Sequence, residues 1–246
     1  MKLGNFLREN GSKLTDYGLS GLGSLIDDAP TESEILLHKA ENQLSNIDSF
    51  FETHQLLIKA IEVQIFSLLS KLGIIAPKPF EEKIAVVNKL GILAPRILMK
   101  IRELSNDREN GSDVEKKERL ENKLDITALF VKTTKRFMCN FFQDFEIVFH
   151  EAPPDWGKVN RNCWLGSAKH GYKMIFHDKG KAHIQVIGVL DYCEIMNYRI
   201  ESIDGEYIPL IRAFIKLSLW EIDPVRVFGE LYEEVLMSDK LRLLDI

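Results

Sequence analysis

Apolar residues recur at helical spacing in the first half of the chain, between short breaks of polar residues, glycine or proline. From Thr31 to about residue 51 and from Thr53 to Leu72, apolar side chains lie three or four positions apart, which is typical of helices with one buried face. Thr31 and Glu34 have the spacing of a capping box at the start of the first helix. Gly73 is suited to end the second, because glycine adopts the left-handed conformation common after a helix.

The same pattern continues through three more helices. Residues 80–90 predict a short helix that stops at Gly91, and Pro95 is suited to the first turn of the next helix. A polar run ends that helix, and Ser112 with Glu115 has the spacing of a second capping box, which opens a long helix. Amphipathic helices joined by short breaks predict an antiparallel bundle.

After residue 143 the pattern changes to short runs of β-branched and aromatic residues. The runs that predict strands are residues 145–149, 173–176, 182–188, 198–203 and 207–217. Asp204-Gly205 predicts a tight hairpin between the last two runs. Pro224 is suited to begin a closing helix.

These elements predict an α+β fold in which a helical bundle precedes a small antiparallel sheet with a C-terminal helix. The bundle is expected over residues 31–143 and the α+β module over residues 144–246. Residues 1–30 contain five glycines among scattered apolar residues, and we expect a flexible N-terminal arm there.

The charge and the cysteines narrow the classes of function. The net charge is −5, so contact with nucleic-acid phosphates would need a local basic patch. The chain has three cysteines, Cys139, Cys163 and Cys193, which are too far apart for a zinc motif or a disulfide framework. Isolated cysteines favour a reducing compartment, and no apolar run is long enough for a membrane span, so we expect a cytoplasmic protein.

One segment carries a family resemblance. The stretch EEKIAVVNKLGILAPRILMKIRELSNDRENGSDVEKKERLENKLDITALFVKTTKRF has a short helix ending in Leu-Gly, a helix ending in Ile-Arg-Glu-Leu-x-Asn, a polar break and a long helix with a charged first turn. In this order of features, residues 32–143 resemble HEPN domains, a family with many RNA-cleaving members. In that family the polar break carries Arg-x-x-x-x-His.

The resemblance implies a degenerate catalytic site. Its candidate residues are Arg102, Ser105, Asn106, Arg108 and Asn110. Ser105 stands where the family has its arginine, and Asn110 stands where it has its histidine. Histidine moves protons near neutral pH and arginine offsets charge on the reacting phosphate, whereas serine and asparagine do neither. The resemblance therefore implies a catalytically silent member, and silent relatives form dimers that bind nucleic acid, a nucleotide or a partner protein.

The same break also has a simpler interpretation. Asn, Asp and Gly are ordinary turn residues, and Asn110-Gly111-Ser112 is also what a linker and a helix N-cap require. On that interpretation residues 31–143 form a generic helical bundle.

A second candidate site lies in residues 156–173, which contain basic and aromatic residues but no acid. The candidate binding residues are Trp156, Lys158, Arg161, Trp164, Lys169, His170 and Lys173. Cations interleaved with stacking rings are what single-stranded nucleic acid or a nucleotide requires. The alternative is a surface loop whose tryptophans cover the sheet.

His177 and His183 flank a predicted turn and could face each other across two strands. Two histidines without a third ligand make a weak metal site and are more typical of a cross-strand pair. We expect no metal and no cofactor.

Three functional hypotheses follow. The first is a HEPN-like, catalytically silent, homodimeric protein that binds RNA, a nucleotide or a partner protein, in the setting of bacterial defence or toxin–antitoxin systems that the resemblance suggests. The second is a metal-independent ribonuclease with a relocated site, built from Arg102, Arg108 and a histidine such as His170. The third is a structural scaffolding protein.

Overall fold

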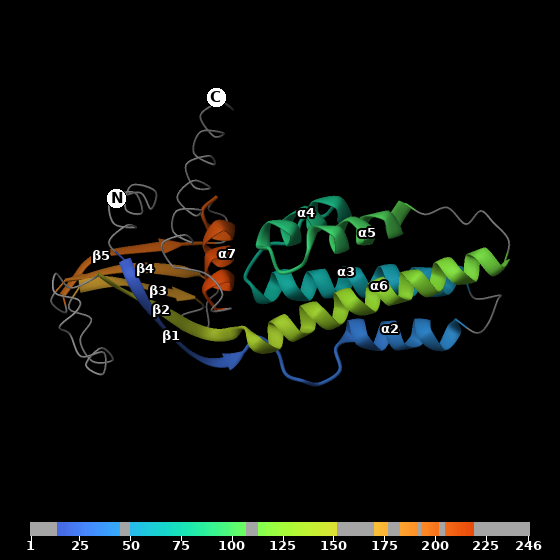
Figure 1. Cartoon of the computed structure of the whole chain (residues 1–246), viewed down its shortest axis with the longest axis horizontal. Coiled ribbons are helices and arrows are strands. Elements are labelled where there is room, and N and C mark those ends of the chain that lie inside the picture. Colours follow the sequence, from blue (N-terminus) through green and yellow to red (C-terminus); the bar gives the residue numbers. More distant parts are fainter. Residues whose placement is uncertain are drawn as a thin grey trace, which may run out of the picture. The chain divides into compact units, whose positions relative to one another are not determined.

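The structure, a computed structural model, divides the chain into two compact units. It describes residues 14–44, 50–106, 113–151, 170–176, 183–190, 193–201 and 205–218. One unit is helical and comprises residues 24–141, and the other contains residues 1–23 and 142–246 (Figure 1). Each unit is considered by itself below.

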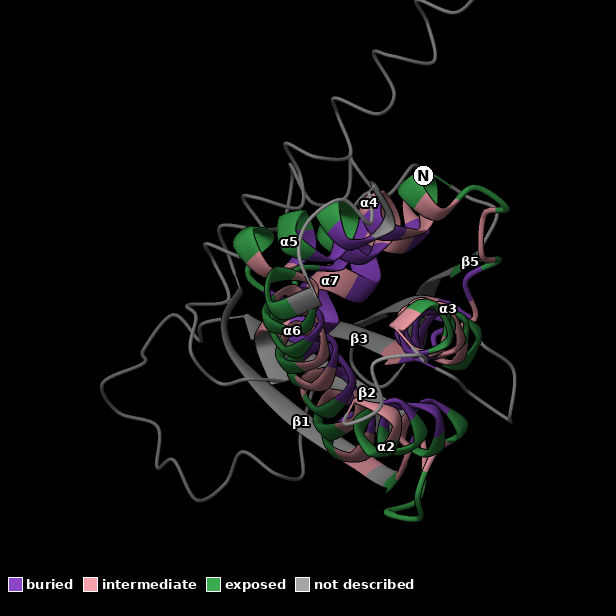
Figure 2. Ribbon diagram, turned by 90° about the vertical axis from the view of Figure 1, so that its right-hand side faces the viewer, coloured by how far each residue is buried: buried purple, intermediate pink, exposed green. Residues whose placement is uncertain are grey.

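The helical unit is a bundle of helices joined by short connections. Its helices are α2 (Glu32–Gln43), α3 (Phe50–Lys71), α4 (Phe80–Leu90), α5 (Pro95–Asn106) and α6 (Asp113–Asn140). Helix α3 packs against α2, α4 and α6, and α5 packs against α4 and α6. In Figure 2 the buried residues of α2, α3 and α6 lie on the sides of these helices that face one another.

The core of the bundle is built from the apolar face of α3. Leu57, Ile61, Ile65 and Leu68 are 0 to 1% exposed, and each is on the helical spacing expected from the sequence. Burying one such side chain contributes roughly 2 kcal/mol. Because α3 contacts three other helices, these residues hold the bundle together.

Several of the local signals at the helix ends are confirmed. The Thr31 side chain accepts from the backbone N–H of Glu34, and the Glu34 carboxylate accepts from the backbone N–H of Thr31 at 2.8 Å, so the capping box is complete. Gly73 and Gly91 have φ of 69° and 71°, the left-handed conformation that ends α3 and α4. Helix α5 begins at Pro95.

The sequence pattern placed the break between the first two helices too late in the chain. The sequence pattern predicted a first helix that ran to about residue 51, but α2 ends at Gln43 and α3 already begins at Phe50. Phe50 therefore belongs to the first turn of α3. Apolar periodicity alone does not mark where one amphipathic helix stops and the next starts.

The two ends of the helical unit lie side by side. The backbone N–H of Leu25 donates to the carbonyl oxygen of Met138 at 3.1 Å and to that of Phe141 at 3.0 Å. The chain thus enters and leaves the bundle at neighbouring points.

The second unit contains a sheet and a helix. Its elements are β1 (Leu14–Ser24), β2 (Phe142–Glu151), β3 (His170–Phe176), β4 (Ile184–Leu190), β5 (Cys193–Ile200) and α7 (Tyr207–Ser218). The strand order is β1-β2-β3-β4-β5, and β2 to β5 form an antiparallel meander with a register shift between Gly188 and Val189. Helix α7 contacts β4, and the rings of Phe176 and Phe214 lie 6.4 Å apart.

The α+β fold class is therefore confirmed, with an N-terminal helical region followed by an antiparallel sheet and a helix. Two details of this unit differ from expectation. Part of the expected flexible N-terminal arm is strand β1, which is hydrogen-bonded beside β2. Residues 207–217, expected to be a strand, belong to α7, so Asp204-Gly205 does not join two strands. The expected helix from Pro224 lies outside the described residues.

Within the described residues, no helix is both long enough and apolar enough to cross a membrane.

Candidate functional site

The break that would carry the family's chemistry separates α5 from α6. Helix α5 ends at Asn106, so Ser105 and Asn106 lie in its last turn, although the structure does not describe their side chains. Arg108 and Asn110 lie outside the described residues, as does Ser112 of the second expected capping box. The order of helix, polar break and long helix is present, while the geometry of the candidate catalytic positions remains a prediction.

Arg102 is the one candidate of this group whose side chain is described. Its Nε lies 2.5 Å from the Oε2 of Glu81 on α4, and both side chains are about half exposed. An exposed ion pair of this kind contributes at most about 1 kcal/mol to stability. The Glu81 carboxylate does, however, offset the positive charge of Arg102, which weakens the attraction of this guanidinium for a phosphate.

A histidine that the sequence patterns did not single out lies elsewhere in the bundle. His54 on α3 is half-buried, and its Nδ1 accepts a hydrogen bond from the Nζ of Lys123 on α6 at 3.4 Å. The two residues are 69 positions apart, so their contact depends on the packing of α3 against α6 and could not be predicted from the sequence.

The expected binding loop falls almost entirely outside the described residues. Trp156, Lys158, Arg161, Trp164 and Lys169 are not described. His170 and Lys173 lie in β3, opposite Leu190 and Ile187 of β4, but their side chains are not described either. The predicted nucleic-acid site of residues 156–173 therefore stays a prediction.

The histidine near the sheet is a buried residue. His183 is 4% exposed, and its Nδ1 lies 3.5 Å from an Nη2 of Arg199 on β5. His177, its expected cross-strand neighbour, lies outside the described residues. In the part of the chain that the structure describes, no three His, Cys, Asp or Glu side chains come together as metal ligands would.

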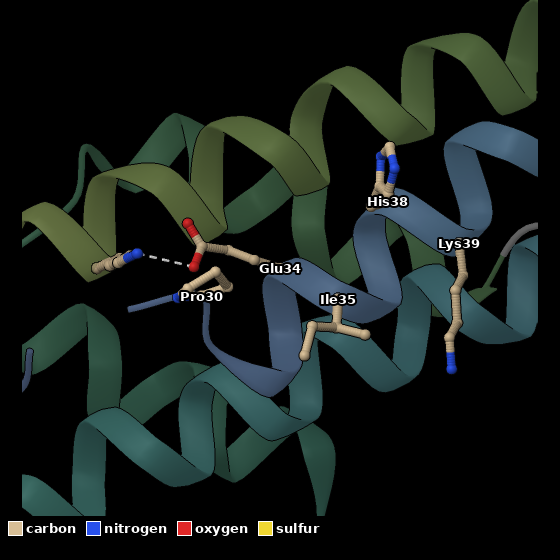
Figure 3. Close-up of a pocket in the computed structure, with 6 residues that line it drawn as sticks. Pro30, Glu34, Ile35, His38 and Lys39 are labelled. Atoms are coloured by element: carbon tan, nitrogen blue, oxygen red, sulfur yellow. Dashed lines mark hydrogen bonds and ion pairs between the residues drawn. The ribbon is translucent and has the colours of Figure 1, made fainter. Parts of the chain in front are cut away.

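A surface cavity of about 470 Å³ lies beside the N-terminal half of α2. It is lined by Pro30, Glu34, Ile35, His38, Lys39 and Lys135. In Figure 3, Ile35 and Lys39 extend from α2 on the side opposite to His38. The Glu34 carboxylate lies 2.9 Å from the Nζ of Lys135 on α6, so these two charges form an ion pair with each other.

Lys135 connects α6 to the segment that precedes α2. Besides Glu34, its Nζ donates to the carbonyl oxygens of Asp28 and Ala29, both at 3.1 Å. Burial alone would raise the pKa of Glu34, but hydrogen bonds from Lys135 and Thr31 outweigh it and lower the pKa below its usual value. The hydrogen bond to Glu34 raises the pKa of Lys135. Both groups thus stay charged at neutral pH, and we call the contact of Lys135 with Glu34, Asp28 and Ala29 the clamp between α6 and the start of α2.

A buried polar network crosses the bundle close to this clamp. The Ser33 hydroxyl on α2 donates to the Oε1 of Gln64 on α3, and the Nε2 of Gln64 donates to the hydroxyl of Thr134 on α6 at 2.7 Å and to the carbonyl oxygen of Val131 at 3.4 Å. Gln64 is 1% exposed, so the bonds satisfy a group that would otherwise be buried without a partner. In the sequence, the sign of this network is Gln64, a polar residue on the apolar face of α3.

Comparisons of the chain with protein-family models, with curated proteins and with solved structures give no match.

Proposed function

We propose that this chain is a HEPN-like binding protein that does not cleave RNA and that recognises a partner protein. The proposal places it in the cytoplasm, in a defence or toxin–antitoxin setting of the kind that the resemblance suggests. The observation that carries it is the ion pair of Arg102 with Glu81 beside a break that has no arginine or histidine at the family's catalytic positions.

The order of the helices supports the family part of the proposal. Helix α4 ends in Leu90 before Gly91, α5 ends at Asn106, and the 28-residue α6 follows a polar break. This is the order on which the resemblance depends.

The charges support a protein rather than RNA as the ligand. The basic residues of the bundle are interleaved with a nearly equal number of acidic residues, whereas RNA binding requires a surplus of positive charge on one face. The one described cation of the candidate site, Arg102, already has a carboxylate partner. Protein interfaces tolerate mixed charge, because complementary patches set specificity.

Incubation of the full chain with total RNA tests whether it cleaves. We expect intact RNA with the unaltered protein and with Arg102→Ala. RNA fragments whose appearance depends on Arg102 or on His54 would instead establish the ribonuclease hypothesis, because an arginine can hold a phosphate and a histidine can move a proton near neutral pH.

Binding of a labelled single-stranded RNA at two salt concentrations tests the ligand class. We expect no salt-dependent binding. Affinity that falls with salt, and that falls further when Lys158 and Arg161 are replaced by Glu, would identify the loop of residues 156–173 as a nucleic-acid site and would replace the protein ligand in the proposal.

A further inference from the structure

One face of α6 is exposed along most of the helix. It consists of Glu118, Glu121, Asp125, Leu129, Lys132 and Arg136, and we call these residues the outer stripe. They are spaced three or four positions apart, so they lie on one side of the helix. All are exposed, and Leu129 near the middle is 50% exposed. The buried residues of α6, such as Leu120 and Val131, lie on the other side.

The charges of the outer stripe are separated along the helix. Glu118, Glu121 and Asp125 form an acidic half, and Lys132 and Arg136 form a basic half. Like charges three or four positions apart on a helix repel each other. Among the described residues, none of these five has an ion pair, so this face gains nothing within the chain from its arrangement of charge.

The helix dipole accounts for little of this pattern. Acids near the start of a helix and bases near its end are favourable, but the effect is confined to the first and last turns. Helix α6 runs from Asp113 to Asn140, so Asp125 and Lys132 lie well inside it. The separation of charge therefore favours a binding partner with the opposite arrangement.

A second copy of α6 in antiparallel orientation has that arrangement. The pair Asp125 and Lys132 and the pair Glu121 and Arg136 share the same midpoint, between residues 128 and 129. A two-fold axis through this midpoint sets Asp125 against Lys132 of the second copy and Glu121 against Arg136 of the second copy. Because a two-fold interface repeats every contact, each pair forms twice, with the two Leu129 side chains at the centre.

We propose that the outer stripe is a self-association surface through which two copies of this chain pair antiparallel along α6. This inference does not depend on the family resemblance, since it rests on the exposure and the charges of α6. A different protein would have to carry the same two charge halves at the same spacing, whereas a second copy has them by symmetry.

The size of the stripe sets the strength of the contact. Glu118 to Arg136 spans roughly 27 Å of helix, which at a helix breadth of about 10 Å gives roughly 300 Å² per copy. A stable interface buries about 800 Å² per partner, so this contact alone gives a weak, reversible dimer. Because exposed ion pairs supply the attraction, salt weakens it.

Sedimentation velocity of the full chain over a range of concentrations tests the proposal. We expect a reversible dimer at about 50 mM salt and a Kd at least about tenfold higher at about 500 mM salt. Glu121→Lys with Asp125→Lys makes the stripe basic throughout, and Lys132→Glu with Arg136→Glu makes it acidic. Each double variant is expected to raise the Kd by at least about 30-fold, because four attractions become repulsions.

Two further experiments, which combine the basic and the acidic variant, distinguish the proposed contact from a nonspecific effect of net charge on self-association. An equimolar mixture of the two double variants is expected to form heterodimers, and the variant with all four substitutions is expected to recover the homodimer. Lys39→Glu with Lys59→Glu, at exposed positions on α2 and α3, is the matched control for the acidic variant and should leave self-association unchanged. Far-UV circular dichroism verifies that every variant keeps its helices.

A chain that stays monomeric at low salt, or a dimer that survives both double variants, would overturn the proposal. So would a mixture of the two variants that fails to form heterodimers. These outcomes concern oligomeric state only, so they leave the proposed absence of RNA cleavage untouched.

Discussion

The substitution Lys135→Met tests whether the clamp beside α2 stabilises the helical unit. Methionine keeps most of the apolar stem of lysine but removes the ammonium group. The loss breaks the contact with Glu34 at 2.9 Å and the two contacts with the carbonyl oxygens of Asp28 and Ala29 at 3.1 Å.

The expected cost follows from the exposure of each partner. Asp28 and Ala29 are exposed, so water replaces Lys135 on their carbonyl oxygens and little free energy is lost there. The side chains of Glu34 and Lys135 are 27 and 16% exposed, and this ion pair is screened only in part. We expect the free energy of unfolding to fall by about 1 to 2 kcal/mol at neutral pH.

The pH dependence separates this clamp from a simple packing effect. The hydrogen bonds from Lys135 and Thr31 lower the pKa of Glu34 in the folded protein below its ordinary value, so its stabilising contribution is present above the ordinary pKa and is lost as the pH falls through the folded pKa. Urea unfolding of the full chain, followed by helical circular dichroism, measures the difference between the unaltered protein and Lys135→Met. The difference should be constant from pH 7 to about pH 5 and should shrink below it.

A control and a refuting result are available on the same surface. Lys39→Met removes an exposed lysine that also lines the cavity and should change the unfolding free energy by less than about 0.5 kcal/mol. A cost for Lys135→Met no larger than that of Lys39→Met, or a cost that is the same at pH 7 and at acidic pH, would show that the ion pair does not stabilise the bundle.

Two further predictions concern the interior and the helix ends. Gln64→Leu should lower the unfolding free energy by about 2 kcal/mol because it removes the hydrogen bonds to Ser33 and Thr134. A double-mutant cycle with Thr134→Val should show a coupling free energy of about 1 kcal/mol, and additive effects of the two substitutions would contradict the network. Gly91→Ala should cost about 1 kcal/mol because φ is 71° at this position, and an unchanged midpoint in thermal unfolding would show that the left-handed turn is not maintained in solution.

The ends of several helices could be predicted from the sequence because their causes are local. The Thr31 and Glu34 side chains cap α2 within a single turn, and Gly91 and Pro95 act through their own backbone conformations. Such signals need only a few neighbouring residues. The apolar periodicity of α3 and α6 was equally direct, because one face of each helix is buried over many turns.

The elements that were misjudged depend on contacts between distant residues. Residues 207–217 are rich in β-branched and aromatic residues and were expected to form a strand. In the structure, Tyr207, Leu210, Ile211 and Phe214 are fully buried at helical spacing, and Ala213 and Ile215 are buried as well, so most of the circumference of α7 is covered. A helix buried on most sides has a nearly continuous apolar run, so the residue types resemble a strand and tertiary packing decides the outcome. Strand β1 depends on its neighbour β2, which lies more than a hundred residues later.

The candidate site was predictable only in part. The order of helices around the polar break followed from the sequence, but the contact of Arg102 with Glu81 did not, because it depends on how α4 and α5 are packed. The contact of His54 with Lys123 could not be predicted either, because it depends on how α3 and α6 are packed. Residue types suggest which chemistry a chain can carry, whereas helix packing decides which charges meet.

The interruption of the sheet unit by the bundle bears on the order in which the chain folds. Strands β1 and β2 are neighbours in the sheet, yet the chain between them contains every helix from α2 to α6. Bringing the ends of an unstructured segment of roughly 120 residues together would cost about 4 kcal/mol in loop entropy. A bundle that has already formed removes most of this cost, because Leu25 lies within hydrogen-bonding distance of Phe141. We therefore expect the helices to form before the first strand pairs with the second.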